Sequence, residues 1–107
     1  MDVAQGPIFR SLADPTRRAI FEHLCRDGER NVRQLTDLAG VSQPAVSKHL
    51  GRLKLAGLVQ ERRAGRETHY SARPQCLAPL IDWMTLYGAF WRERFDGLEA
   101  LLQQMDP

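Results

Sequence analysis

The segment VSQPAVSKHL (41–50) combines a few apolar residues with five side chains that form hydrogen bonds. In a helix, the apolar residues would share one face and the polar side chains would cover the rest. Glutamine can bind adenine through two hydrogen bonds, lysine can donate to guanine acceptors, and serine can bond to several bases. The segment therefore either forms an ordinary solvated helix face or contacts base edges. The candidate DNA-binding residues of this segment are Ser42, Gln43, Ser47, Lys48 and His49.

Basic residues continue beyond this segment. Arg52 lies further along the same expected helix, and Arg62, Arg63 and Arg66 surround the expected tip of a β-hairpin. All four are candidates for contacts with DNA phosphates, and the hairpin arginines also for the minor groove. Residues 42–73 contain seven Lys/Arg and two Glu, whereas 74–107 contain two Arg and five Asp/Glu. This basic stretch suits a polyanionic partner, although charge alone fits a solvated surface equally well.

Capping residues and glycines divide the first half of the chain into helices. A short helix is expected around residues 4–12, and a helix-turn-helix over about residues 32–56, with the recognition helix at 43–56. The start signals are Asp14-Pro15, Asn31 with Gln34, and Ser42, and the stop signals are Gly28, Gly40 and Gly57. The inner face of the helix after Asn31 would consist of Leu35, Leu38 and Ala39.

After Gly57 the spacing of apolar residues changes from helical to partly alternating, which predicts a β-hairpin. LVQERR (58–63) and ETHYSA (67–72) are short, partly alternating runs on either side of Ala64-Gly65-Arg66. A wing is therefore expected over about residues 58–72. The predicted fold class is α+β and mostly α: a single winged helix-turn-helix domain, 1–107, with the order α-α-α-α-β-β-α.

The last helix, expected over about residues 76–105, has a regular apolar seam. Its apolar residues alternate at spacings of four and three, which is the pattern of a dimerisation helix. The alternative is a helix packed wholly on its own domain. We expect a homodimer, with the short first helix adding to the interface, because long exposed apolar seams usually have partners. The seam residues assigned to the interface are Leu77, Ile81, Met84, Trp91, Phe95, Leu98 and Leu102.

Three segments together resemble the ArsR/SmtB family of bacterial winged-helix repressors: SLADPTRRAIFEHL, QLTDLAGVSQPAVSKHLGRLKLAGLV and RRAGRETHYS. The turn glycine, the cap serine and the apolar positions of the middle segment are all in family register. The resemblance implies a homodimeric transcription regulator, usually a repressor, whose inducer weakens operator binding. With one recognition helix in each subunit, the operator is expected to be a palindrome in double-stranded DNA.

The family's metal sites are not matched. Where some members have a Cys-x-Cys pair, this chain has Gln34 and Thr36, and no histidine follows His69 to complete a site on the last helix. No metal and no cofactor are therefore expected, which places the chain in a branch that lacks the metal motif. Cys25 and Cys76 could form a thiol-based sensor, since some members use two thiols, but two inert cysteines are favoured.

Other classes of protein fit less well. The sequence shows no nucleophile and base arrangement, no phosphate-binding glycine loop and no paired carboxylates, so an enzyme is not expected. No segment is long and apolar enough for a membrane span, and the absence of a signal-peptide pattern favours the cytoplasm. A winged-helix module that binds proteins in place of DNA is the main alternative. Neither the operator nor an inducer is indicated by the sequence.

Overall fold

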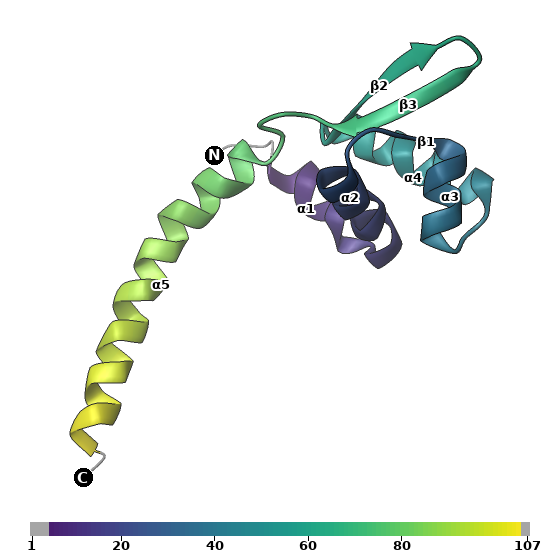
Figure 1. Ribbon diagram of the computed structural model, residues 1–107. Coiled ribbons are helices and arrows are strands. Elements are labelled where there is room, and N and C mark those ends of the chain that lie inside the picture. Colours follow the sequence, from purple (N-terminus) through teal and green to yellow (C-terminus); the bar gives the residue numbers. More distant parts are fainter. Residues whose placement is uncertain (1–4, 106–107) are drawn as a thin grey trace. The chain divides into compact units, whose positions relative to one another are not determined.

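The computed structural model describes residues 5–105 (Figure 1). The chain divides into two compact units, one up to Leu77 and one from Ala78 onward. The first unit contains four helices and a small sheet, and the second is a single helix, α5, Ala78–Met105. This element content confirms the predicted fold class. The expected single domain over 1–107 stays a prediction.

Four helices form most of the first unit: α1 (Gln5–Ala13), α2 (Pro15–Asp27), α3 (Val32–Ala39) and α4 (Gln43–Leu55). Three of them begin at the caps read from the sequence. The Asp14 carboxylate accepts a hydrogen bond from the backbone N–H of Arg17 at 2.9 Å. The Ser42 hydroxyl accepts one from Ala45 N–H at 3.3 Å, which fixes the start of α4.

The capping box at α3 is complete. The Asn31 side chain accepts from Gln34 N–H at 2.8 Å, and the Gln34 side chain accepts from Asn31 N–H at 2.9 Å. Two backbone donors at the helix start are therefore satisfied without water. Gly40, in the left-handed conformation with φ of 70°, ends α3 and allows the tight turn into α4.

The sheet has three antiparallel strands in the order β1-β3-β2: β1 (Arg30–Asn31), β2 (Val59–Ala64) and β3 (Glu67–Ala72). The predicted hairpin is the β2–β3 pair, with Ala64 opposite Glu67 across the turn. In Figure 1 this hairpin extends past the helices and forms the wing. The two-residue β1 is an addition that the sequence did not predict. It pairs Arg30 with Tyr70 and Asn31 with His69.

The core of the first unit lies between the helices and the base of the wing. On α4, Val46, Leu50 and Leu53 are all completely buried, as their spacing predicts. The expected inward position of Leu38 is wrong, because this side chain is 48% exposed and only Leu35 of α3 is buried. The remaining core side chains come from α1, α2 and the start of β2: Ile8, Ile20, Phe21, Leu24, Leu58 and Val59.

α5 begins two residues later than the expected start at Cys76. A turn, in which Cys76 N–H donates to the Arg73 carbonyl at 3.2 Å, precedes it, and Pro79 lies in its first turn, where the missing N–H costs no internal hydrogen bond. Leu77 therefore lies before α5, in the first unit. At 28 residues α5 is about 42 Å long. No helix within residues 5–105 is long and apolar enough to cross a membrane.

Candidate nucleic-acid interface

α4 presents a polar surface opposite its buried face. Ser42, Gln43, Ser47, Lys48 and Arg52 are exposed, while Val46, Leu50 and Leu53 of the same helix lie in the core. The helix is therefore anchored on one side and free on the other. The side chains proposed from the sequence to contact DNA lie on the free side, with one exception.

That exception is His49, which is half-buried against α2. Its Nδ1 accepts a hydrogen bond from the Nε of Arg17 at 3.4 Å. Lys54, on the side of α4 toward the wing, is also engaged: its Nζ lies 2.6 Å from the Glu61 carboxylate. This contact raises the pKa of Lys54 and lowers the pKa of Glu61, because each charge stabilises the other. Both contacts fix the position of α4 against its neighbours.

The N-terminus of α4 and the wing share a cleft of about 300 Å³. Gln43 lines it from α4, and Arg66 and Thr68 line it from the wing. Arg33 of α3 lines the same cleft and is exposed. Arg33 is not among the residues expected from the sequence to bind DNA. The available signal was a basic residue in the first turn of the helix that precedes the recognition helix. The structure thus brings Gln43 and Arg66 together beside a further guanidinium.

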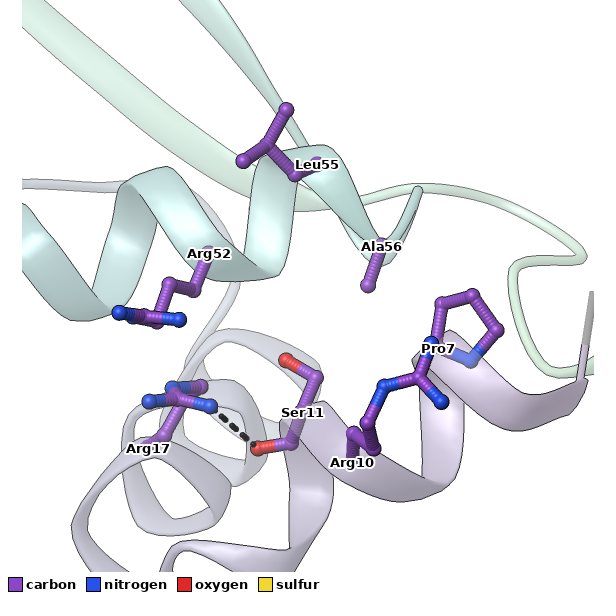
Figure 2. Close-up of a pocket in the computed structure, with 7 residues that line it drawn as sticks. All are labelled: Pro7, Arg10, Ser11, Arg17, Arg52, Leu55 and Ala56. Carbon is purple, nitrogen blue, oxygen red and sulfur yellow. Dashed lines mark hydrogen bonds between the residues drawn. The ribbon is translucent and has the colours of Figure 1, made fainter.

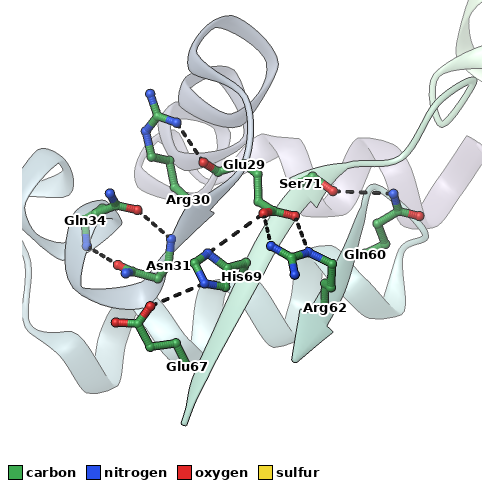
Figure 3. Close-up of polar contacts among 9 residues, drawn as sticks. All are labelled: Glu29, Arg30, Asn31, Gln34, Gln60, Arg62, Glu67, His69 and Ser71. Carbon is green, nitrogen blue, oxygen red and sulfur yellow. Dashed lines mark hydrogen bonds and ion pairs between the residues drawn. The ribbon is translucent and has the colours of Figure 1, made fainter. Parts of the chain in front are cut away.

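The wing arginines differ in their surroundings. Arg63 and Arg66 are exposed, whereas Arg62 forms two hydrogen bonds to Glu29, from Nη2 to Oε1 at 2.6 Å and from Nε to Oε2 at 3.1 Å (Figure 3). The Arg62 hydrogen bond lowers the pKa of Glu29 below its ordinary value of 4.5. The Nδ1 of His69 is 3.9 Å from the same carboxylate. Glu29 therefore competes with any phosphate for Arg62, a contact that sequence reasoning did not find.

The two cysteines show little sign of activation. Cys25 on α2 is exposed and Cys76 is half-buried, and the pKa of each is raised, first of all by burial of the thiol. The negative charge of the Cys25 thiolate contributes to the raised pKa of Cys76, so the two sulfur atoms interact electrostatically.

Within residues 5–105, no three His, Cys, Asp or Glu side chains are grouped so that they could hold a metal ion.

The second unit carries the apolar seam. The side chains of Ile81, Met84, Trp91, Phe95, Leu98 and Leu102 are all more than half exposed in the single chain. Trp91 and Phe95 contact each other along the helix, with ring centroids 6.2 Å apart. The Arg94 guanidinium lies 3.4 Å above the centre of the Phe90 ring. α5 thus shows a continuous apolar face with a partly covered aromatic flank.

A capped, outward-facing polar helix after a tight turn, followed by a basic β-hairpin, defines a winged helix-turn-helix protein. Comparison with known proteins gives the family. The family model described as "Bacterial regulatory protein, arsR family" matches residues 14–61. The chain belongs to this family of regulatory proteins, which confirms both the family expected from the sequence and the expectation of a regulator and not an enzyme.

Individual relatives agree with this assignment. The chain is 42% identical over 94 residues to the HTH-type transcriptional regulator Rv2034 of Mycobacterium tuberculosis, covering 88% of this chain and 84% of the relative. It is 44% identical over 78 residues to the repressor SmtB of the same species (strain H37Rv), covering 73% of this chain. The match spans only 57% of SmtB, little more than half its length. Among solved structures, an ArsR-like transcriptional regulator from Rhodococcus sp. RHA1 matches with a TM-score of 0.73 and 28% identity, covering 92% of each chain.

Proposed function

We propose that this chain is a DNA-binding transcriptional repressor. α4 would occupy the major groove, with Gln43, Ser47 and Lys48 at base edges, while Arg63 and Arg66 of the wing bind phosphates. The observation that carries the proposal is the exposed polar face of α4, whose Gln43 lines one cleft with Arg66 of the wing within a single compact unit. The named relatives are transcriptional regulators and repressors, which supports the same function.

The remaining candidate residues have secondary roles in this proposal. The main role of Ser42 is to cap α4, and its contact with DNA would be secondary. Arg52 would bind a phosphate beside the groove. His49 and Arg62 are already bonded to Arg17 and Glu29, so they would contribute less than the free side chains. A repressor of bacterial genes would act in the cytoplasm, where the DNA lies.

A homodimer is part of the proposal. The exposed seam of α5 repeats at heptad spacing, so a second copy can present the same apolar face to it, as isologous interfaces require. Two recognition helices would then bind an imperfect palindrome with half-site centres about 34–36 Å apart. Sedimentation equilibrium of the full chain at micromolar concentration tests this part directly, and a folded monomer would exclude it.

The decisive experiment for DNA binding is a salt titration of affinity for a random duplex and for the promoter next to its own gene. A repressor should bind both duplexes, and the slope of log affinity against log salt concentration should be about −0.9 for each phosphate contact. It should bind the promoter about 10³-fold or more tightly than the random duplex. A winged-helix module that binds proteins would show no duplex affinity at 50 mM salt. That result would replace the repressor with the protein-interaction alternative.

A thiol-responsive repressor is the second candidate, because the negative charge of the Cys25 thiolate helps to raise the pKa of Cys76, so each thiol is within electrostatic range of the other. Its test compares the wild type with a Cys25→Ser, Cys76→Ser double variant during titration with polysulfide, peroxide and arsenite. Loss of operator binding in the wild type alone would identify the two thiols as the sensor. Equal affinity throughout would establish that both are inert and that any inducer acts elsewhere.

A further inference from the structure

A second cleft, of about 250 Å³, lies where α1, α2 and α4 meet (Figure 2). Arg10 on α1, Arg17 on α2 and Arg52 on α4 are among the residues that line it. This cleft is separate from the one that Gln43 shares with the wing, and only Arg52 belongs to the candidate DNA contacts. Three helices therefore bring three positive charges to one concave site.

The hydroxyl group of Ser11 is buried at this cleft without a hydrogen-bond partner. Ser11 is only 4% exposed, and its Oγ bonds to nothing within residues 5–105. A serine inside a helix can bond its hydroxyl to the carbonyl four residues before it, and Ser11 does not. Figure 2 shows the hydroxyl directed toward the space between Arg17 and Arg52. An unpaired buried hydroxyl is costly, so a ligand that accepts a hydrogen bond from it would stabilise the site.

The positive charges of the cleft are poorly balanced. Neither Arg10 nor Arg52 forms an ion pair with a carboxylate within residues 5–105, and Arg17 is held by the Ser11 carbonyl at 3.3 Å and by His49. The pKa of Asp14 is lowered, first of all by the Arg17 backbone N–H that donates to its carboxylate, so this acidic group is engaged at the start of α2. Among the described residues, no acidic side chain lines the cleft beside the three arginines.

We propose that this cleft binds a phosphate-type oxyanion. The Ser11 hydroxyl and the Arg17 guanidinium would donate to its oxygens, with Arg10 and Arg52 completing the charge balance, because guanidinium groups match the geometry of phosphate oxygens. The cleft is large enough for a phosphate group together with part of the molecule that carries it. Since Arg52 is on α4 and the other donors are on α1 and α2, the bound oxyanion links the recognition helix to the helices that support it.

The test is a titration of the ¹⁵N-labelled full chain with inorganic phosphate at constant ionic strength, followed by amide chemical shifts. Saturable shifts should concentrate on Ser11, Arg17, Arg52 and Ala56. Ser11→Ala and Arg10→Gln should each weaken phosphate binding roughly tenfold, as expected for the loss of one hydrogen bond or charge to an ionised group. Arg26→Gln removes the same charge from an exposed position at the other end of α2 and should have no effect.

Two results would overturn the proposal. One is a set of shifts spread over all basic residues without saturation, and the other is equal weakening by Arg26→Gln and Arg10→Gln. Ser11→Ala removes an unsatisfied hydroxyl, so it should fold with unchanged or raised stability in phosphate-free buffer. A loss of phosphate binding in that variant is therefore not explained by unfolding. None of these measurements uses DNA, so they remain informative even if the repressor function fails.

A second arm identifies the source of the phosphate. If the oxyanion is a DNA backbone phosphate, inorganic phosphate should compete with a random duplex, and Arg10→Gln should flatten the salt slope by about 0.9. If it is a free phosphate-bearing small molecule, duplex binding should leave phosphate in the cleft, and the salt slope of Arg10→Gln should equal that of the wild type. Both outcomes require the site, and they differ only in what occupies it.

Discussion

The ion pair between Glu29 and Arg62 leads to a prediction about DNA binding that differs from the sequence-based one. The sequence treats Arg62 as equivalent to its neighbours in the wing, but the structure pairs it with a carboxylate through two hydrogen bonds, of 2.6 and 3.1 Å. Glu29 occupies two of the five N–H donors of this guanidinium and offsets its charge, so a phosphate binds Arg62 more weakly while the pair is intact. Glu29→Gln removes the competing charge and should therefore release Arg62 for a phosphate contact.

The size of the effect follows from one additional contact. Each neutralised phosphate steepens the slope of log affinity against log salt by about 0.9. Between 50 and 200 mM salt, one extra contact makes the loss of affinity about 3.5-fold larger. We expect a change of up to this size for Glu29→Gln, and no such change when Arg62→Gln is added to it, because the released side chain is then absent.

Fluorescence anisotropy with a labelled random duplex, at four or more salt concentrations, measures this slope. Glu22→Gln is the matched control, because it removes the same charge from an exposed position on α2 without freeing an arginine. If Glu29→Gln and Glu22→Gln change the slope equally, the reasoning is refuted. The effect would then come from net charge and not from competition for Arg62.

Three further predictions concern the rest of the chain. Trp91→Asp should give a monomer with a folded first unit by sedimentation and circular dichroism, because a charge cannot be buried in the apolar seam; an unchanged dimer would place the interface elsewhere. Asn31→Ala should lower the free energy of unfolding in urea by about 0.5–2 kcal/mol through loss of the capping box, and an unshifted midpoint would show that the box contributes nothing. Because burial raises the pKa of Cys25 and Cys76 above the ordinary 9.0, both thiols should be alkylated slowly at pH 7 and faster as the pH rises through 9; rapid alkylation at pH 7 would contradict this.

Local signals in the sequence predicted much of the fold. The caps at Asp14, Asn31 and Ser42 lie within three residues of the N–H groups that they bind, so their roles depend on nearby residues alone. The buried positions of α4 follow from helical spacing in the same way. The exposed side chains of its other face follow too, because burying one set of residues at that spacing leaves the rest outside.

Contacts between distant residues could not be predicted in this way. β1 is two residues long and is defined only by its pairing with β3. The Glu29–Arg62 and Arg17–His49 contacts join residues more than thirty positions apart, and neither has a spacing rule. The helical repeat predicts that Leu38 faces inward, but the packing of α3 buries only Leu35. The helical repeat determines which side chains share a face of a helix. How much of that face is buried depends on the neighbouring elements that pack against it.

The central claim is that the exposed face of α4 recognises bases while the wing binds the DNA backbone. The most direct test measures the affinity of wild type, Lys48→Ala and Arg63→Ala for the operator and for every single-base variant of one half-site. Lys48→Ala should lose about 1–3 kcal/mol of discrimination at a single base position, and Arg63→Ala should weaken all sequences equally. Uniform weakening by Lys48→Ala, with base discrimination intact at every position, would contradict the account.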